Sequence, residues 1–254
     1  MLADLVSSPI HLQPTASLAE RVLLPGDPGR ALRLAEALLD TPKMFNHHRG
    51  LWGYTGTAKA DGEPLTIQST GMGGPSAAIV IAELHDLGAR TLVRVGTCGA
   101  LHPALVLGEL LVVTEAMSAD GTSHALGAGD RVSGDPSLLE RLTAACGAGT
   151  ARGPVVSTDL FYDGRDGEEQ DWREQGARAV EMEAATLFAL AARRGFSAGA
   201  VLIVSDVLSP QRTRIDADVL ADAELRLGRV AIAALAAEPD SAGSAEAPDA
   251  ASAS

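Results

Sequence analysis

The stretch Arg94-Val95-Gly96-Thr97-Cys98-Gly99-Ala100 decides how the rest of this sequence is interpreted. The apolar, β-branched run Thr91–Val95 predicts a strand that ends in a glycine-rich turn, with Arg94 just before that turn. Glycines let backbone N–H groups approach an oxyanion closely, and arginine supplies a permanent, forked positive charge. Because a buried charge is costly unless it is paired, we expect Arg94 to bind either an anion or a structural carboxylate.

Two further glycine turns lie upstream, each after a short apolar run and before a helix-like segment. They are Leu24-Pro25-Gly26-Asp27-Pro28-Gly29-Arg30 and Gly71-Met72-Gly73-Gly74-Pro75-Ser76. In the first, Asp27 is typical of an N-cap and Pro28 of the first helical position, so a helix N-terminus would offer N–H donors to an anion. Ordinary capping and a close-packed crossover are the alternative explanations. Three such turns together predict a single anion-binding site.

Strands and helices alternate along the sequence. Strands are predicted at Arg21–Leu24, Leu65–Ser69, Thr91–Val95, Glu109–Thr114 and Ala200–Ser205, and helices at Gly29–Leu39, Ser76–Leu87, Pro136–Ala145, Glu183–Arg193 and Ala217–Ala236. This alternation predicts an α/β fold with one domain and three layers, α/β/α, around a central mixed, largely parallel sheet. Ligands of such sheets bind at the carboxyl ends of the strands, where the three glycine turns and Ser205-Asp206 are expected.

The chain of 254 residues fits one domain, which we assign to residues 1–237. From Glu238 onward the sequence contains no long apolar residue and is rich in Ala, Ser, Pro, Asp and Glu. Such a segment cannot bury enough surface to offset its ordering entropy, so residues 238–254 are predicted to form a disordered acidic tail.

Composition excludes several classes of function. The net charge of −13 argues against a nucleic-acid partner, and no apolar run approaches the roughly 20 residues that span a membrane. The N-terminus lacks a signal-peptide pattern and the two cysteines form no pair motif, so we expect a cytoplasmic protein. The six histidines show no metal spacing, and no complete dinucleotide or P-loop motif is present. We therefore expect no metal and no cofactor.

Two acidic residues, Glu181 and Glu183, precede a strongly helical run. Residues two apart do not share a helix face, so at most one of them is expected to point into a given pocket. Acids that complement a helix dipole are the alternative. Asp206 follows the apolar run Val201–Val204 and would lie at the carboxyl end of a strand, although a turn-starting aspartate would look the same.

Taken together, these residues resemble the hexameric, bacterial-type purine nucleoside phosphorylases of the nucleoside phosphorylase superfamily. The matching pieces run in order from about residue 11 to 236 and are Leu24-Pro25-Gly26-Asp27-Pro28, His48-Arg49-Gly50, Gly71-Met72-Gly73-Gly74-Pro75-Ser76, Arg94-Val95-Gly96-Thr97-Cys98-Gly99-Ala100, Asp159-Leu160-Phe161-Tyr162, Val180-Glu181-Met182-Glu183-Ala184 and Ser205-Asp206. The resemblance implies the nucleoside phosphorylase fold and the reversible cleavage of a nucleoside by inorganic phosphate, which is a co-substrate and not a cofactor.

The resemblance also implies roles for individual residues. The phosphate ligands would be Gly26, Arg30, Arg94 and Thr97 of one subunit, with Arg49 reaching the phosphate of the neighbouring subunit. The nucleoside contacts would be Met72, Cys98, Gly99, Phe161, Glu181, Met182, Glu183 and Ser205, with His11 touching the neighbour's sugar. Asp206 would be the general acid that protonates the departing purine. Shared sites imply a homo-oligomer, by family analogy a hexamer built as a trimer of dimers.

Three other functions are alternatives. A uridine phosphorylase carries a glutamine and an arginine two apart in an extra loop, whereas Gln170 has no arginine at that spacing. A nucleosidase of the methylthioadenosine type uses water and has no need of Arg30, Arg49 and Arg94. A non-catalytic storage protein would have lost catalytic groups that this sequence keeps. The preference between 6-oxo and 6-amino purines, the need for the 2′-hydroxyl, and the choice of Arg212 or Arg214 as the partner of Asp206 stay open.

Overall fold

The structure, a computed structural model, describes residues 9–209 and 211–236. Its strands are β1 (Arg21–Leu24), β2 (Leu39–Asn46), β3 (Gly53–Ala58), β4 (Pro64–Gln68), β5 (Thr91–Ala100), β6 (Leu110–Ala119), β7 (Arg131–Val132), β8 (Ala151–Thr158), β9 (Ala179–Glu181), β10 (Ser197–Val207) and β11 (Thr213–Arg214). Its helices are α1 (Pro28–Leu38), α2 (Gly74–Asp86), α3 (Gly121–Ala125), α4 (Pro136–Cys146), α5 (Glu168–Glu174), α6 (Ala184–Arg194) and α7 (Ala217–Leu235), and the 3-10 turn η1 spans His48–Gly50.

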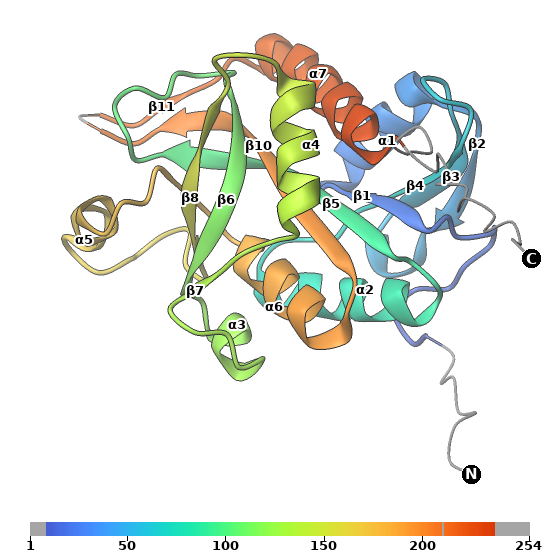
Figure 1. Ribbon diagram of the computed structural model, residues 1–254, viewed down its shortest axis with the longest axis horizontal. Coiled ribbons are helices and arrows are strands. Elements are labelled where there is room, and N and C mark those ends of the chain that lie inside the picture. The colour runs from blue at the N-terminus through green and yellow to red at the C-terminus, as the bar shows by residue number, and fades with distance from the viewer. Residues whose placement is uncertain (1–8, 210, 237–254) are drawn as a thin grey trace, which may run out of the picture.

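The strands form one mixed sheet in the order β11-β10-β6-β8-β9-β5-β1-β4-β3-β2. Strand β5 pairs in parallel with β1 on one edge and with β10 on the other. Because β10 also pairs with β6, and β5 with β9, the strands β5, β10, β6, β8 and β9 close on one another. Figure 1 shows β5 and β10 crossing the centre of the molecule, with β2, β3 and β4 forming the open end of the sheet.

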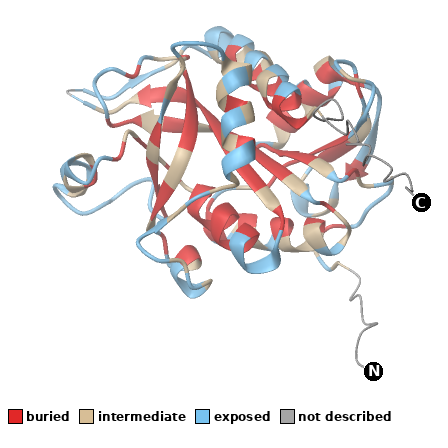
Figure 2. Ribbon diagram, viewed as in Figure 1, coloured by how far each residue is buried: buried red, intermediate tan, exposed pale blue. Residues whose placement is uncertain are grey.

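Helices cover both faces of the sheet. One apolar core lies under α1, α4 and α7 and includes Leu34, Leu142 and Leu227. The other lies under α2 and α6 and includes Val80 and Phe188. Successive strand residues point to opposite faces, and the two cores take alternate residues of β5 and β10 accordingly. Figure 2 shows the buried residues concentrated in these strands and on the inner faces of the helices.

The α/β fold with a central mixed sheet is confirmed, and each predicted strand and helix is present, although β5, β6 and β10 are longer than predicted. The predicted glycine turn after Val95 is wrong, because β5 continues as a strand to Ala100 and pairs with β10 along that length. The tail predicted at residues 238–254 lies outside the described part of the chain. No helix within the described part is long and apolar enough to cross a membrane.

Candidate active site

A cavity of about 960 Å³ opens at the carboxyl ends of β1, β4, β5 and β10. This is the edge at which sequence patterns place a ligand. The predicted site residues that line the cavity are Gly26, Arg30, Met72, Arg94, Thr97, Cys98, Gly99, Phe161, Glu181, Met182, Glu183, Ser205 and Asp206. His11 and Arg49 are not among its lining residues.

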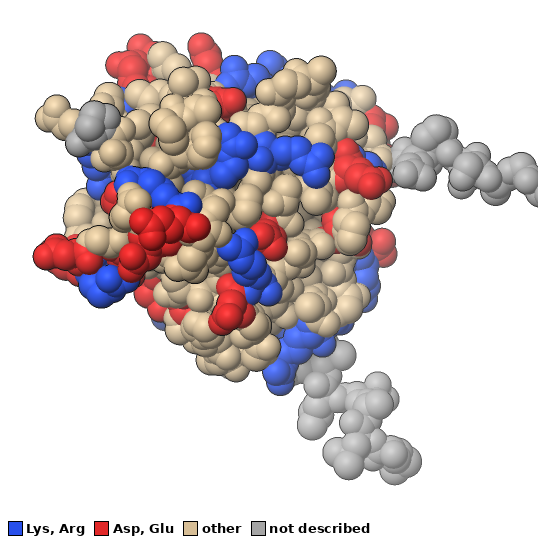
Figure 3. Space-filling view, turned by 60° about the vertical axis from the view of Figure 1, so that its left-hand side comes forward, with Lys and Arg blue, Asp and Glu red and all other residues tan. Residues whose placement is uncertain are grey.

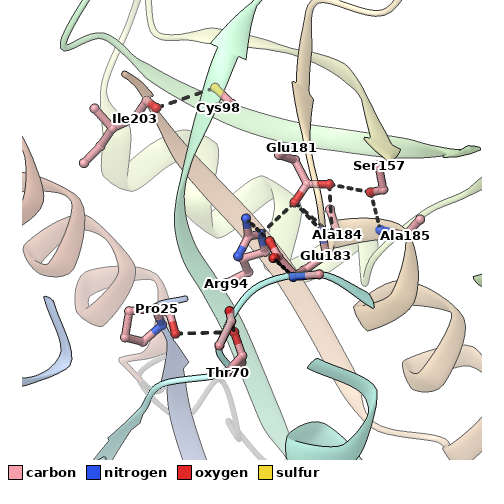
Figure 4. Close-up of polar contacts among 12 residues, drawn as sticks. Pro25, Thr70, Arg94, Cys98, Ser157, Glu181, Glu183, Ala184, Ala185 and Ile203 are labelled. Atoms are coloured by element: carbon pink, nitrogen blue, oxygen red, sulfur yellow. Dashed lines mark hydrogen bonds and ion pairs between the residues drawn. The ribbon is translucent and has the colours of Figure 1, made fainter. Parts of the chain in front are cut away.

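The two upstream glycine turns lie against each other on one wall of the cavity. Thr70 N–H donates to the carbonyl of Pro25 at 2.9 Å, and Gly71 N–H donates to that of Gly26 at 3.1 Å. A Cβ at Gly26 would lie only 3.1 Å from the Gly71 oxygen, so glycine permits this close approach. Figure 4 shows the Thr70–Pro25 contact beside Arg94.

The N-terminus of α1 is capped by the chain itself. The carboxylate of Asp27 accepts hydrogen bonds from the N–H groups of Gly29 and Arg30, both at 2.9 Å, and Pro28 begins the helix. The capping prediction is therefore confirmed. The expectation that this terminus offers those N–H donors to an anion is wrong, because Asp27 already occupies them. The side chain of Arg30, by contrast, lines the cavity.

Arg94 lies in the middle of β5, on the face covered by α2 and α6. Its side chain runs over Gly96, where a Cβ would come within 2.8 Å of the guanidinium carbon Cζ. A residue with any side chain would therefore push the guanidinium away. Gly96 is required by the packing of Arg94 on the strand and not by a turn.

Both predicted acids hold Arg94. Glu181 Oε2 accepts from Arg94 Nε at 2.8 Å, and Glu183 Oε2 lies 2.5 Å from Arg94 Nη2. The expectation that only one acid faces the pocket is wrong because neither lies inside a helix: Glu181 ends β9, and Glu183 is the N-cap of α6. Arg94 is thus paired with carboxylates (Figure 4) and is also a lining residue of the cavity, so binding of a structural carboxylate and binding of an anion both have a physical basis.

A serine completes this network. Ser157 Oγ donates to Glu181 Oε1 and accepts from Ala185 N–H at 2.9 Å, while Glu181 also accepts from Ala184 N–H at 3.0 Å. These contacts tie the first turn of α6 to Glu181. The helix N-terminus therefore stabilises a carboxylate, which in turn holds the arginine.

The electrostatics of the pair follow from burial. Burial alone lowers the pKa of Arg94, but Glu183 and Glu181 more than offset it, so the pKa of Arg94 is raised. Burial and the nearby Glu181 raise the pKa of Glu183, although Arg94 opposes the shift. Burial also raises the pKa of the Cys98 thiol, which keeps it neutral.

Asp206 enters the cavity at a β-bulge. The pairing of β10 with β5 shifts register between Val204 and Asp206, which leaves Ser205 as the extra residue. Ser205 Oγ donates to Asp206 Oδ2 at 2.8 Å. Bulges re-aim side chains and are common beside active sites. The bulge accounts for the placement of a buried carboxylate at the end of an apolar strand.

Both candidate arginines contact Asp206 Oδ1, but they are not equivalent. Arg212 Nε donates to it at 3.0 Å, and the Arg212 guanidinium lies 4.7 Å from the ring centroid of Phe161. Arg214 Nε lies 3.3 Å from the same oxygen, yet its side chain is 72% exposed, against 39% for Arg212. Arg212 lines the cavity and Arg214 does not. The geometry favours Arg212 as the partner of Asp206.

His11 and Arg49 do not line this cavity, and His11 contacts His48, the residue before Arg49. His11 Nδ1 lies 2.7 Å from Glu83 Oε1, and His11 O contacts His48 Nδ1 at 3.1 Å. Arg49 follows in η1 with a positive φ of 58°, an uncommon conformation for a non-glycine residue. Their predicted contacts with a neighbouring subunit remain predictions.

Several residues of the site escaped the sequence reasoning. Ser157, Glu224 and the segment 163–170 are the main ones, and Glu224 accepts from Arg30 Nε at 2.8 Å. One signal was available for Glu224, because it occupies a position on the apolar face of α7 together with Leu227 and Ala231. A charged residue in such a stripe needs a buried partner.

Charged side chains of both signs share one face of the molecule. On the face shown in Figure 3, basic side chains form short bands interrupted by acidic ones. Within the described residues, no group of three or more His, Cys, Asp or Glu side chains is placed to hold a metal ion.

Comparison with known proteins identifies the class. A sequence model of the Phosphorylase superfamily matches residues 20–236, and the chain belongs to this superfamily. It is 39% identical over 207 residues, 78% of this chain and 86% of the relative, to the purine nucleoside phosphorylase DeoD-type of Geobacillus kaustophilus. It is 40% identical over 193 residues, 73% of this chain and 77% of the relative, to the guanosine phosphorylase of Halorubrum lacusprofundi. It is also 37% identical over 205 residues, 78% of this chain and 85% of the relative, to the purine nucleoside phosphorylase DeoD-type of Clostridium beijerinckii.

Proposed function

We propose that this chain is a purine nucleoside phosphorylase, which cleaves purine ribo- or deoxyribonucleosides with inorganic phosphate to give the free base and the sugar 1-phosphate. One observation carries the proposal: the guanidinium groups of Arg30 and Arg94 and the carboxyl group of Asp206 line a single cavity. The names of the relatives support it.

The chemistry requires positive groups at one end of the sugar and an acid at the other. Phosphate would be held by Arg30 and Arg94, and one of its oxygens would form a bond to the anomeric carbon as the bond to the base breaks. Such a displacement passes through an oxocarbenium-like transition state. Holding the phosphate and the sugar in the reactive geometry would supply much of the rate acceleration. Asp206 would transfer a proton to the purine ring, and the electron pair of the broken bond leaves with the base.

Other residues would hold the nucleoside. Glu183 would accept hydrogen bonds from the ribose hydroxyls, and Phe161, exposed at the cavity wall, would pack on the base. Met72 and Met182 would pack around the sugar, with Cys98, Gly99, Glu181 and Ser205 nearby. Thr97 and Gly26 would complete the phosphate site. The proposal needs no metal and no cofactor.

The finer expectations belong to the same proposal. They are a cytoplasmic role in purine salvage, one catalytic domain over residues 1–237 with a separate tail over residues 238–254, and a hexamer in which His11 and Arg49 complete a neighbour's site. The chain would take small-molecule substrates and neither nucleic acid nor a membrane as partner.

A panel of inosine, guanosine, adenosine, their 2′-deoxy forms, uridine and methylthioadenosine, assayed with and without phosphate, tests the proposal. Phosphate-dependent release of purine bases, with formation of sugar 1-phosphate, is expected. Base release at the same rate without phosphate would indicate a hydrolase, release of uracil in preference to purines would indicate a uridine phosphorylase, and tight binding without turnover would indicate a storage protein.

A further inference from the structure

A buried ion pair joins the proposed phosphate site to the C-terminal helix. Arg30 Nε donates to Glu224 Oε1 at 2.8 Å, and the two side chains are only 8% and 2% exposed. Desolvating two charges is expensive, and such a pair is retained only with good geometry and further hydrogen bonds. The presence of this buried ion pair therefore has to be explained, whereas an ion pair on the surface would carry no such desolvation cost.

The second carboxylate oxygen of Glu224 supplies those further bonds. Oε2 accepts from Arg33 Nε at 2.8 Å and lies 2.7 Å from Arg33 Nη2. Arg33 lies one turn after Arg30 on α1, with its side chain half-exposed at 47%. Two guanidinium groups thus share one carboxylate, and Arg33 Nη2 also lies 3.5 Å from Asp27 Oδ2.

The atom through which Arg30 is held determines where the rest of its guanidinium points. The group is planar and its donors have a fixed fork geometry, so a bond through Nε fixes the plane and leaves the Nη atoms free to face elsewhere. Within the described residues, Glu224 is the partner that the structure gives to the Arg30 side chain. Because Arg30 lines the cavity beside Gly26 and Arg94, the free edge is available to an anion there.

Close contact between α1 and α7 brings Glu224 to this point. One turn after Glu224, a Cβ at Gly228 would lie 2.5 Å from Leu38 Cδ1 and 2.8 Å from Leu34 Cδ2, both on α1. The glycine lets the two helices approach closely. The close approach of α1 and α7 therefore helps to bring the carboxylate of Glu224 within hydrogen-bond distance of Arg30.

We propose that Glu224 is a positioning residue for phosphate, which acts by fixing the orientation of the Arg30 guanidinium and never touches the substrate itself. This inference rests on the proposed phosphorolysis. The direction in which phosphate binding changes when the charge of Glu224 is removed is informative, because a buried negative charge near an anion site weakens the attraction for phosphate. If charge alone mattered, removing it would tighten phosphate binding, whereas loss of orientation weakens it.

The isosteric variant Glu224→Gln tests the proposal, with KM for phosphate, KM for the nucleoside and kcat measured separately. Loss of one charge-assisted hydrogen bond predicts a rise of about tenfold in the KM for phosphate. The nucleoside KM should stay within about twofold of wild type, as expected when a uniform binding contribution to one substrate is lost. The matched control is Asp222→Asn, an exposed acid on the same helix, which should leave all three parameters unchanged.

A double-mutant cycle with Arg30→Gln guards against a general loss of structure, since the double variant removes both buried charges together. If Glu224 acts through Arg30, adding Glu224→Gln to Arg30→Gln causes no further rise in the phosphate KM. An unchanged or lower phosphate KM in Glu224→Gln, or additive effects in the cycle, overturns the inference. A wild-type protein that releases base without phosphate instead contradicts the proposed function, so the two failures are distinguishable.

Discussion

Glu181 holds Arg94 through the guanidinium Nε at 2.8 Å, and both side chains are almost completely buried. Arg30 is held in the same way by Glu224. In both pairs the carboxylate binds the inner edge of the guanidinium, and the residue also lines the cavity. Two anchored arginines would form a preorganised site for the proposed phosphate, because little side-chain freedom would be left to be lost on binding.

The hydroxyl of Ser157 is the first testable part of this arrangement. Ser157→Ala removes a donor to the buried Glu181 and an acceptor for Ala185 N–H, so the free energy of unfolding should fall by about 1–3 kcal/mol. Denaturant titration measures the change. Ser133→Ala, at an exposed position, is the control and should change the stability by less than about 0.5 kcal/mol. Equal stability of the two variants would contradict the role given to the hydroxyl.

Gly96→Ala tests the packing of Arg94 on β5. The added Cβ would lie 2.8 Å from Cζ, so the guanidinium must move and the KM for phosphate should rise by about tenfold or more. Steady-state kinetics at varied phosphate check this. Gly129→Ala, where a Cβ meets nothing closer than 4.0 Å, should have no such effect. A variant with normal phosphate KM would mean that Arg94 does not contact phosphate.

Asp206→Asn removes the proposed proton donor while keeping the shape of the side chain. Phosphorolysis of purine nucleosides should slow by about 10²–10⁴-fold, as is typical for loss of a general acid. Asp222→Asn provides the control for a change of charge alone. Near-normal turnover of every purine nucleoside by the Asp206 variant would remove this residue from the mechanism.

The two arginines at Asp206 should differ in their effect on kcat. Arg212 bridges Asp206 and Phe161 at the cavity, whereas Arg214 is mostly exposed. Arg212→Met should lower kcat by about 10–100-fold, the equivalent of one charge-assisted hydrogen bond, and Arg214→Met by less than about threefold. The reverse order would assign the supporting role to Arg214.

Glu83 predicts a pH dependence of stability. Burial raises its pKa, but the ring of His11 and the N–H groups of Leu12, His11 and Ile10 more than offset this, so the pKa lies below its ordinary value of 4.5. A carboxyl group whose pKa is lowered on folding stabilises the protein above its unfolded pKa and loses that contribution as pH falls through the folded one.

Glu83→Gln should therefore be less stable than wild type at pH 7, and the gap should close as pH falls below about 4.5. Urea unfolding at a series of pH values measures the gap. Glu140→Gln, an exposed acid on α4, is expected to follow the wild-type curve. A gap that persists unchanged at low pH would show that ionisation of Glu83 contributes nothing.

Local signals explain what the sequence could predict. Strand β1 and the capped start of α1 follow from an apolar run and from the Asp27-Pro28 pair, both of which act over a few residues. Strands β2 and β8 were missed because Pro42 and Gly153-Pro154 interrupt their patterns. Their strand character comes from neighbours in the sheet, which no local pattern reveals.

In the site, too, local sequence signals predicted some features, and contacts between distant parts of the chain determined the others. Glycine turns and family motifs brought most of the cavity-lining residues to attention, but the anchor of Arg30 lies 194 residues away along the chain. The end of β5 was misjudged because its two glycines suggested a turn. Gly96 instead makes room for Arg94, and Gly99 makes room for Leu208, so the strand continues. Long-range packing decided both points.

Helix α7 and the residues just before it connect the last elements of the fold to the candidate active site. The helix starts at Ala217, five residues after Arg212, and carries Glu224 about two turns further on. One continuous segment, from Arg212 to Glu224, therefore contacts both Asp206 and Arg30. Shortening the protein from its C-terminus into this helix would first remove Leu235, Ile232 and Leu227, which belong to the core under α1, α4 and α7, and only then Glu224. A truncated version would therefore lose stability before it lost the anchor of Arg30, so its folding has to be checked before its activity is interpreted.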